Sequence, residues 1–252
     1  YAAKSRMDVV AKTMTRVAQE ILLKQNTISA NVVLKAVGEQ TSTNSLTHLF
    51  KGGSSTGLTL ADLNHLITRN KRINTSFMGG TPDQANARGI TDLIVPPEIT
   101  ESLRAIAYNP ITSNVANQEF LAQEAYSNGG TGTPTFYGIN IMELNEFGGK
   151  GTAGKFDKIF GAQTAKTYLD KDGSNGEAFD STTDMICLGI DRSRESLVRP
   201  VAVDAENGAE FNLIADDQYS IRQSKIGYFG SLEEGRVVLD NRALGGVIVY
   251  AA

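Results

Sequence analysis

The stretch best suited to chemistry is the glycine-rich sequence GKGTAGK at residues 149–155. Its spacing fits G-x-x-x-x-G-K, a phosphate-binding loop in which backbone amides cradle the phosphates and the lysine reaches them. That loop needs Ser or Thr next, to hold magnesium through its hydroxyl, but Phe156 follows here. The same glycines fit G-x-G-x-x-G, yet no acidic residue follows in a convincing second strand. We therefore interpret residues 148–154 as a mobile surface loop.

A second candidate is acidic, because the sequence DKDGSNG at residues 170–176 resembles the opening of a calcium loop. Such a loop needs glycine at its sixth position and glutamate at its twelfth. Asn175 and Ser181 stand at those positions. The stretch therefore predicts a tight acidic turn and no metal site.

Histidine and cysteine are too sparse for the common catalytic centres. His48 and His65 are the only histidines, and neither has a Cys or His neighbour at metal-ligand spacing. The sequence holds no G-x-S-x-G elbow around a nucleophilic serine. Cys187, the single cysteine, cannot form an internal disulfide, which suits a reducing cytoplasm. We therefore expect no catalytic residue, no metal and no cofactor.

Both helices and strands are expected to position these residues. Residues 5–24 predict a helix, because one apolar stripe recurs at three-four spacing through Met7, Val10, Met14, Val17 and Ile21. Residues 36–57 are rich in Ser, Thr and Gly and predict little regular structure. A second helix is expected from Thr59, whose hydroxyl and the carboxylate of Asp62 form a pair like a capping box. Cations at the end of this helix suit its dipole, and they are Arg69, Lys71 and Arg72.

The middle of the chain predicts short strands and helices separated by loops. Residues 92–95 form an apolar run, Pro96 and Pro97 end it, and a helix is expected over residues 98–108. Further elements are predicted from their apolar runs: strands over 136–144 and 185–190 and a short helix near 162–169.

The stretch from residue 194 to residue 250 is the densest in strand-forming runs. Apolar residues alternate with polar ones through Phe211, Leu213, Tyr219, Ile221, Ile226 and Tyr228. The final run at residues 247–249 is expected to pair with a strand formed earlier. Few strict βαβ alternations occur along the chain, so we predict an α+β fold rather than a doubly wound sheet.

Length and charge restrict the classes of function. The 252 residues, 40% apolar and 21% charged, suffice for one large domain or two lobes. No apolar run approaches the roughly 20 residues needed to span a bilayer, so no membrane association is expected. The net charge of −4 argues against a tight, nonspecific grip on nucleic acid.

Three segments together resemble the major capsid protein of tailed bacteriophages, whose fold is shared with encapsulin shells. The segments are the long early helix with its variable loop, the pair GLTLADL at 57–63 and LIVPPEI at 93–99, and the terminal GRVVLDNRA at 235–243. The sequence FYGINI at 136–141 is similar to the strand that usually follows the middle helix. The resemblance covers most of the chain as a pattern of elements, and none of its motifs is specific by itself.

The resemblance implies an α+β fold with two lobes. The peripheral lobe carries a long spine helix and an extended sheet, and the axial lobe surrounds a local symmetry axis. Residues 1–56 would hold the spine helix and the start of the peripheral lobe, 57–190 mostly the axial lobe, and 191–252 the strands that return to the peripheral lobe. The family also carries an N-terminal arm and a hairpin before the spine helix. Nothing before Lys4 supplies them, so we expect a fragment or a departure from the pattern.

The implied function is structural. The subunit would assemble with itself into pentamers and hexamers of an icosahedral shell, with scaffolding, portal and decoration proteins as partners. The shell would form in the host bacterial cytoplasm and enclose the double-stranded DNA genome in the virion without sequence-specific binding. Arg69, Lys71 and Arg72 would lie at a subunit contact, and the glycine loops at 128–134 and 148–154 would repack between rings of five and six. Two alternatives remain: an encapsulin-like compartment shell filled with enzyme, and a nucleotide-binding enzyme that uses the phosphate-like loop.

Overall fold

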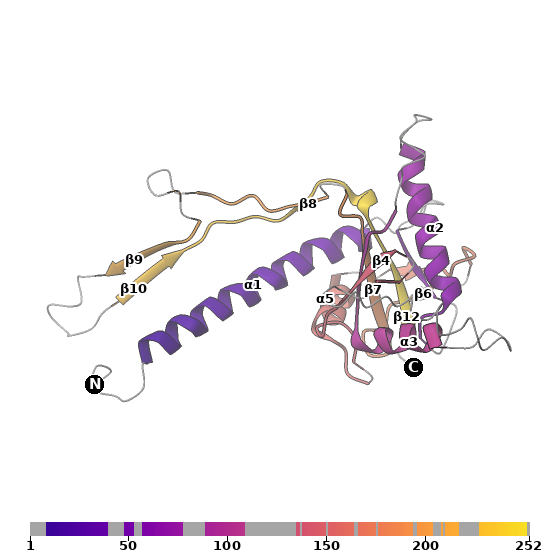
Figure 1. Cartoon of the computed structure of the whole chain (residues 1–252), viewed down its shortest axis with the longest axis horizontal. Helices are drawn as coiled ribbons and strands as arrows, with labels where there is room; N and C mark the ends of the chain where they lie inside the picture. The colour runs from indigo at the N-terminus through magenta and orange to yellow at the C-terminus, as the bar shows by residue number, and fades with distance from the viewer. Residues whose placement is uncertain are drawn as a thin grey trace.

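A computed structural model describes most of the chain. The described residues are 9–39, 48–52, 57–77, 89–108, 135–136, 138–149, 151–163, 166–174, 176–193, 196–203, 208, 210–216 and 227–250. The glycine loop expected at 128–134 lies outside them. Figure 1 shows a compact body built around a sheet, from which one long helix and one long arm project to the same side.

A six-stranded mixed sheet forms the body. In spatial order its strands are β1 (Leu49–Lys51), β12 (Leu244–Tyr250), β7 (Asp184–Ile190), β2 (Asp92–Val95), β4 (Ile139–Glu143) and β3 (Thr135–Phe136). β12 pairs with β7 in antiparallel register along its whole length and with β1 in parallel. β2 runs antiparallel to β7 and parallel to β4. The final strand therefore pairs with earlier ones, as predicted.

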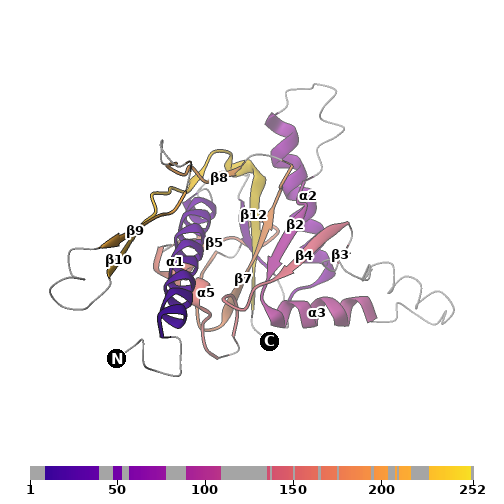
Figure 2. The same ribbon diagram turned by 60° about the vertical axis from the view of Figure 1, so that its left-hand side comes forward.

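Helices cover both faces of the sheet, because the two central strands are apolar on both sides. Along β7, Met185 and Cys187 face one core, while Ile186 and Leu188 face the other. The first core is closed by α2 (Leu60–Phe77) and α3 (Pro97–Tyr108). The second is closed by α5 (Lys155–Gln163) and the end of α1 (Val9–Glu39). Figure 2 shows these helices on opposite sides of the strands.

α1 is longer than the sequence predicted. The expected end at residue 24 is wrong, since the helix continues to Glu39. The reason is a second apolar stripe, Val33, Leu34 and Val37, which is buried against the sheet and holds the last turns in place. The expectation of little structure over 36–57 is correspondingly wrong at 36–39 and at β1. A helix of 31 residues is about 46 Å long.

An arm leaves the body between the neighbouring strands β7 and β12. The chain runs out of β7 and returns into β12 through the short helix η5 (Asn241–Ala243). The arm is held by two antiparallel pairs, β8 (Leu197–Val198) with β11 (Val237–Val238) and β9 (Asn212–Asp216) with β10 (Gly227–Ser231). In Figure 1 the arm runs beside α1 and points to the same side as its N-terminal half. Strands in this region were predicted, although residues 217–226 lie outside the described part.

Local signals placed several elements correctly. The hydroxyl of Thr59 accepts the amide of Asp62 at 3.2 Å, and the carboxylate of Asp62 accepts the amide of Thr59 at 3.3 Å, so the predicted capping box exists. β2 has the predicted bounds, and α3 begins at Pro97. The strand predicted over 136–144 is divided at Gly138, whose φ of 76° makes a turn between β3 and β4.

The helix predicted near 162–169 is wrong. α5 begins earlier, at Lys155, and ends at Gln163, and residues 167–168 form the strand β5, which pairs with β6 (Glu177–Ala178). The helix starts where the glycine loop stops, and Asp157 in its first turn stabilises that start. Among the described helices, none combines the length and apolar composition that crossing a bilayer requires.

Candidate functional site

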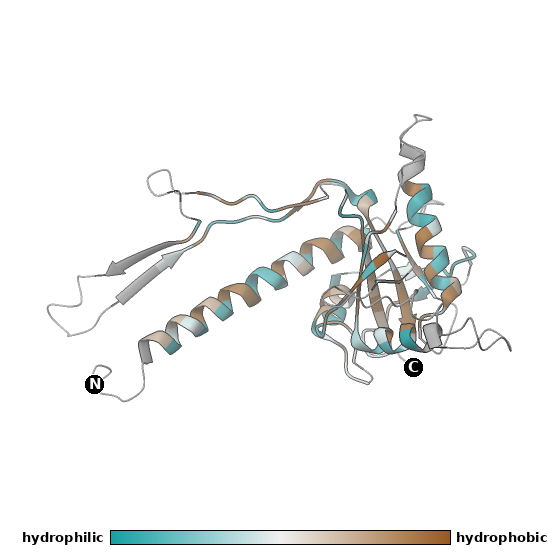
Figure 3. Ribbon diagram, in the orientation of Figure 1, coloured by the Kyte–Doolittle hydropathy of each residue, from teal (hydrophilic) through white to brown (hydrophobic). Residues whose placement is uncertain are grey.

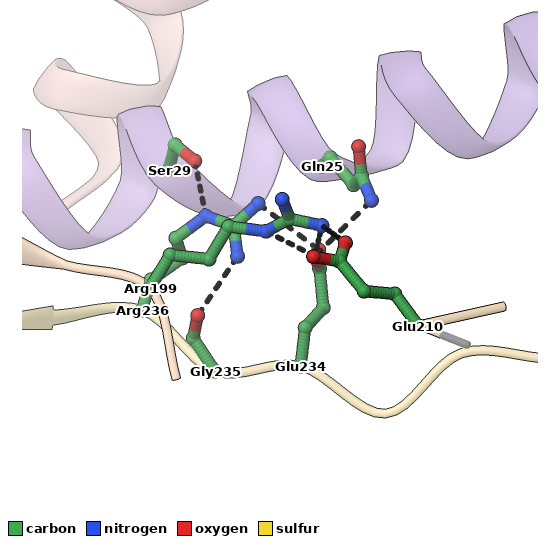
Figure 4. Close-up of polar contacts among 7 residues, drawn as sticks. All are labelled: Gln25, Ser29, Arg199, Glu210, Glu234, Gly235 and Arg236. Atoms are coloured by element: carbon green, nitrogen blue, oxygen red, sulfur yellow. Dashed lines mark hydrogen bonds and ion pairs between the residues drawn. The ribbon is translucent and has the colours of Figure 1, made fainter. Parts of the chain in front are cut away.

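The most elaborate polar contact of the described chain joins the arm to α1, at what we call the arm junction: Gln25, Ser29, Arg199, Glu210, Glu234, Gly235 and Arg236 (Figure 4). Arg199 follows β8 and Arg236 precedes β11, so the two arginines come from opposite sides of the arm. The arm is closed by backbone bonds from Ala202 to Glu233 at 2.9 Å and from Gly235 to Pro200 at 2.8 Å. This backbone pairing brings the two arginines to one carboxylate.

Glu234 is the centre of the junction. Its Oε2 accepts from Nε and Nη2 of Arg199, both at 2.8 Å, and its Oε1 lies 3.1 Å from Nη2 of Arg236. The pKa of Glu234 is lowered: burial acts to raise it, but the bonds from Arg199 and Arg236 outweigh burial. The carboxylate is therefore ionised at neutral pH, and its bonds are charge-assisted.

α1 supplies the remaining partners. Nε2 of Gln25 donates to Oε2 of Glu234 at 3.1 Å, and Nε of Arg236 donates to Oγ of Ser29 at 2.9 Å. The side chains of Arg236 and Glu234 are 8% and 10% exposed, whereas that of Arg199 is 41% exposed. The junction thus fixes the direction of the arm relative to the helix through a nearly buried ion pair, with an exposed arginine completing it.

The sequence did not reveal this junction. Residues 233–235, Glu-Glu-Gly, are typical of a turn and indicate nothing more, and the resemblance offered no role for Arg236. The one available signal was Arg236, which closely follows the acidic pair Glu233 and Glu234 within a strand region. The contacts from Gln25 and Ser29 cross more than 200 positions, so no local pattern could show them.

The three residues predicted to lie at a subunit contact have different surroundings in the structure. The guanidinium of Arg69 lies 5.6 Å from the ring centre of Phe50, and its Nη1 is buried without a hydrogen bond to any residue that the structure describes. Burial lowers the pKa of Arg69. Lys71 and Arg72 are exposed on the outer side of α2. Arg69 therefore packs against its own body, and the role of all three in a subunit contact stays a prediction.

The glycine stretch lies between β4 and α5 in the chain. Gly148 is buried and donates its amide to Oδ2 of Asp157 at 2.5 Å, while Gly151 and Thr152 are exposed. The expectation of a surface loop is thus right for its tip and wrong for its first residue. The carboxylate of Asp157 thus accepts a backbone amide that a phosphate-binding loop would offer to its ligand. Nζ of Lys155 donates to Oγ1 of Thr27 on α1 at 2.9 Å.

The acidic stretch is a tight turn, as predicted. Oδ1 of Asp170 accepts the amides of Asp172 and Ser174 at 3.0 and 2.9 Å, and Gly173 has a φ of 79°. Within the described ranges, no group of three His, Cys, Asp or Glu side chains is placed to hold a metal ion.

The histidines and the cysteine are packed as core-facing residues. His48 is buried, and His65 makes an edge contact with Phe50 at 4.9 Å between ring centres. The pKa of each histidine is lowered by burial and then by the charge of Arg69. Cys187 is fully buried, and burial raises the pKa of its thiol, so it is a poor nucleophile.

Comparisons with known proteins identify the class of fold. No protein-family model matches the chain, and no curated protein matches it. The capsid structure of the cyanophage P-SCSP1u contains a chain that matches 99% of this one, with a TM-score of 0.51, 17% identity and 68% of its own length covered. The holo-SrpI encapsulin complex from Synechococcus elongatus PCC 7942 matches 97% of this chain with a TM-score of 0.49, 13% identity and 66% of its own length covered. The second likeness is too weak to support an inference.

The first likeness extends over nearly the whole chain. It shows that the chain has the fold of a phage capsid protein, and the resemblance seen in the sequence is confirmed at the level of the fold. The mixed α and β architecture predicted from the sequence is also confirmed.

Proposed function

We propose that the chain is a structural subunit that assembles with copies of itself into a closed shell. The observation that carries the proposal is the apolar surface of the two projecting elements. α1 exposes large side chains over its first twenty residues, namely Val17, Leu22, Leu23 and Ile28, and the arm exposes Leu197, Val203, Phe211, Val237 and Leu239. Figure 3 shows this apolar colouring on the projecting helix.

The exposed fraction of these apolar side chains is large for a protein that stays monomeric. Leu22 is 58% exposed, Leu23 49% and Leu239 66%. These residues lie on elements that reach away from the body, so the folded chain offers them little of its own surface. Large apolar side chains left exposed in such number are typical of protein contact surfaces. A subunit of a closed shell buries such surface against its neighbours.

The finer proposal follows the phage capsid fold. The sheet with α2, α3 and α5 would form the axial lobe, while α1 and the arm would form the peripheral lobe. This proposal differs from the boundaries expected from the sequence, which gave residues 1–56 and 191–252, and with them β1 and β12, to the peripheral lobe. Rings of five and six such subunits would build an icosahedral shell around the double-stranded DNA of a tailed phage, inside the host bacterium. The net charge of −4 supports a wall that encloses DNA without gripping it. In this role the subunit needs no catalytic centre.

Sedimentation of paired variants tests the proposal. The protein, expressed from its complete reading frame, should sediment as very large particles. Leu22→Gln with Leu23→Gln should shift it to small species with an unchanged circular dichroism spectrum. The matched control is Lys35→Gln, an exposed position on the same helix near the body. Particles that form equally well with both leucines replaced would refute the role of this surface.

A further inference from the structure

A groove of about 590 Å³ runs along one side of α1, over residues 13–27, and we call it the α1 groove. Nζ of Lys155 donates to Oγ1 of Thr27 at 2.9 Å, so the first residue of α5 borders the groove at this end. Its apolar lining includes Val17 and Leu23, which are 46% and 49% exposed. The described part of the chain therefore leaves this apolar lining in water.

Basic side chains border the α1 groove. They are Arg16, Lys24 and Lys155, whereas Glu20 is the one acid among the described lining residues, so the lining carries a charge of +2. Such a surface attracts a partner of opposite charge and gives it a preferred orientation. The groove therefore fits a segment that presents both acidic and apolar side chains.

The arm carries a segment of this kind beyond the arm junction. We call it the outer arm and define it by the described residues 201–203, 211–216 and 227–233. These residues include two acids and no Lys or Arg, a charge of −2. Val203 is 55% exposed, Phe211 is 39% exposed, and Glu233 is exposed as well. The outer arm thus matches the groove in charge and in apolar surface.

The outer arm cannot enter the groove of its own chain. The arm is fixed to α1 through Gln25 and Ser29. Because an α-helix turns about 100° per residue, these two side chains lie on nearly the opposite side of α1 from Arg16, Glu20 and Lys24. In Figures 1 and 2 the arm runs along one side of α1 and α5 lies on the other. Only another copy can therefore bring an outer arm to the groove.

We propose that the outer arm of one copy docks in the α1 groove of the next copy. The inference rests on the proposed function and deepens it, because it names the two surfaces that meet. The contact joins two different surfaces of the same chain, so it is head-to-tail and repeats from copy to copy. Contacts of this type close into rings when the rotation between copies allows it.

Photocrosslinking in assembled particles tests the contact. Protein with Val203→p-benzoylphenylalanine is assembled together with isotope-labelled wild-type protein, both expressed from the complete reading frame. Irradiation should attach position 203 to a labelled peptide over residues 13–27, which shows that the contact lies between copies. The same probe at Leu169, an apolar residue that is 39% exposed on the body, should not attach to this peptide.

Charge reversal tests the part played by the basic border. Arg16→Glu with Lys24→Glu should lower the yield of this crosslink about tenfold. The matched control is Lys35→Glu with Lys158→Glu, which makes the same change of charge at two exposed positions outside the groove and should leave the yield unchanged. Equal yields from the two double variants would show that the charges of the groove do not select its occupant.

A reciprocal probe identifies the occupant from the other side. Val17→p-benzoylphenylalanine should attach to outer-arm peptides of a labelled copy. Attachment to another α1 or to a different protein would assign the groove to that occupant and overturn this inference, while the proposed function would stand. So would attachment of position 203 to any surface other than residues 13–27 of another copy. Wild-type protein that forms no particles would instead refute the proposed function and, with it, the docking of copies.

Discussion

Arg236 and Ser29 are 207 positions apart in the sequence, yet Nε of the arginine donates to the serine hydroxyl at 2.9 Å. This bond joins the returning strand of the arm to the middle of α1 (Figure 4). The same arginine contacts Glu234 through Nη2 at 3.1 Å and the carbonyl of Gly235 through Nη1 at 2.8 Å. The orientation of the arm is thus set by side chains rather than by a continuous sheet, and this makes it sensitive to single substitutions.

Replacement of Glu234 should release the arm from α1. Glu234→Gln leaves Arg236, whose side chain is 8% exposed, without its charged partner. Hydrogen exchange should increase in peptides over residues 197–203 and 227–238 and stay unchanged in β7. The neighbour Glu233 is exposed, so Glu233→Gln is the matched control. Equal protection of the arm in both variants would show that the junction does not hold it.

Charge reversal at the end of α2 tests the predicted subunit contact. Lys71→Glu with Arg72→Glu changes two exposed side chains, so the fold should persist while assembly falls if this helix end meets a neighbour. Light scattering against protein concentration measures the loss. Arg69→Glu is a poor test, because Arg69 is partly buried against Phe50 and its reversal should lower the stability of the subunit itself. Normal assembly of the double variant would show that these two side chains do not form a subunit contact.

The capping box of α2 should contribute measurably to stability. Thr59→Ala removes the hydroxyl that accepts the amide of Asp62 at 3.2 Å. The free energy of unfolding should fall by about 1 kcal/mol, as for other lost N-caps. Urea denaturation followed by circular dichroism measures it, and Thr68→Ala, at an exposed position inside the same helix, should change stability far less. If Thr68→Ala lowered the free energy of unfolding more than Thr59→Ala, the loss of the cap would not be the cause.

Global stability should depend on pH through Asp157. Because burial raises the pKa of this carboxyl to about 6, its protonated form stabilises the folded chain, and that contribution is lost as pH rises from about 4 to about 6. The whole effect is about 3 kcal/mol. The measurement is the difference between wild-type protein and Asp157→Asn in urea midpoints across this range, which cancels the other carboxyls. A difference in urea midpoint between the two proteins that stays constant with pH would contradict the raised pKa of Asp157.

The sequence predicted those parts of the fold that depend on residues close to one another along the chain. The capping pair Thr59 and Asp62, the prolines that end β2, and the apolar run of β7 are signals within a few residues of one another. The full length of α1 was missed, because its last turns are held by contacts with the sheet rather than by helix propensity.

The candidate sites were harder to predict for a related reason. The glycine stretch departs from a phosphate-binding loop at Phe156, yet nothing local showed that Asp157 would be buried beside it. Likewise, no local pattern marked Glu234 or Arg236, and their respective partners Gln25 and Ser29 come from the other end of the chain. Such sites arise from tertiary packing, which periodicity and spacing do not report.

The central claim is that this chain builds a shell through the apolar surface of α1 and the arm. Electron cryomicroscopy of the protein purified from its complete reading frame tests it most directly. We expect closed particles in which subunits form rings of five and six and in which Leu22, Leu23 and Leu239 are buried between copies. A small soluble species that leaves these side chains in water, or hydrolyses a nucleotide at residues 149–155, would contradict it.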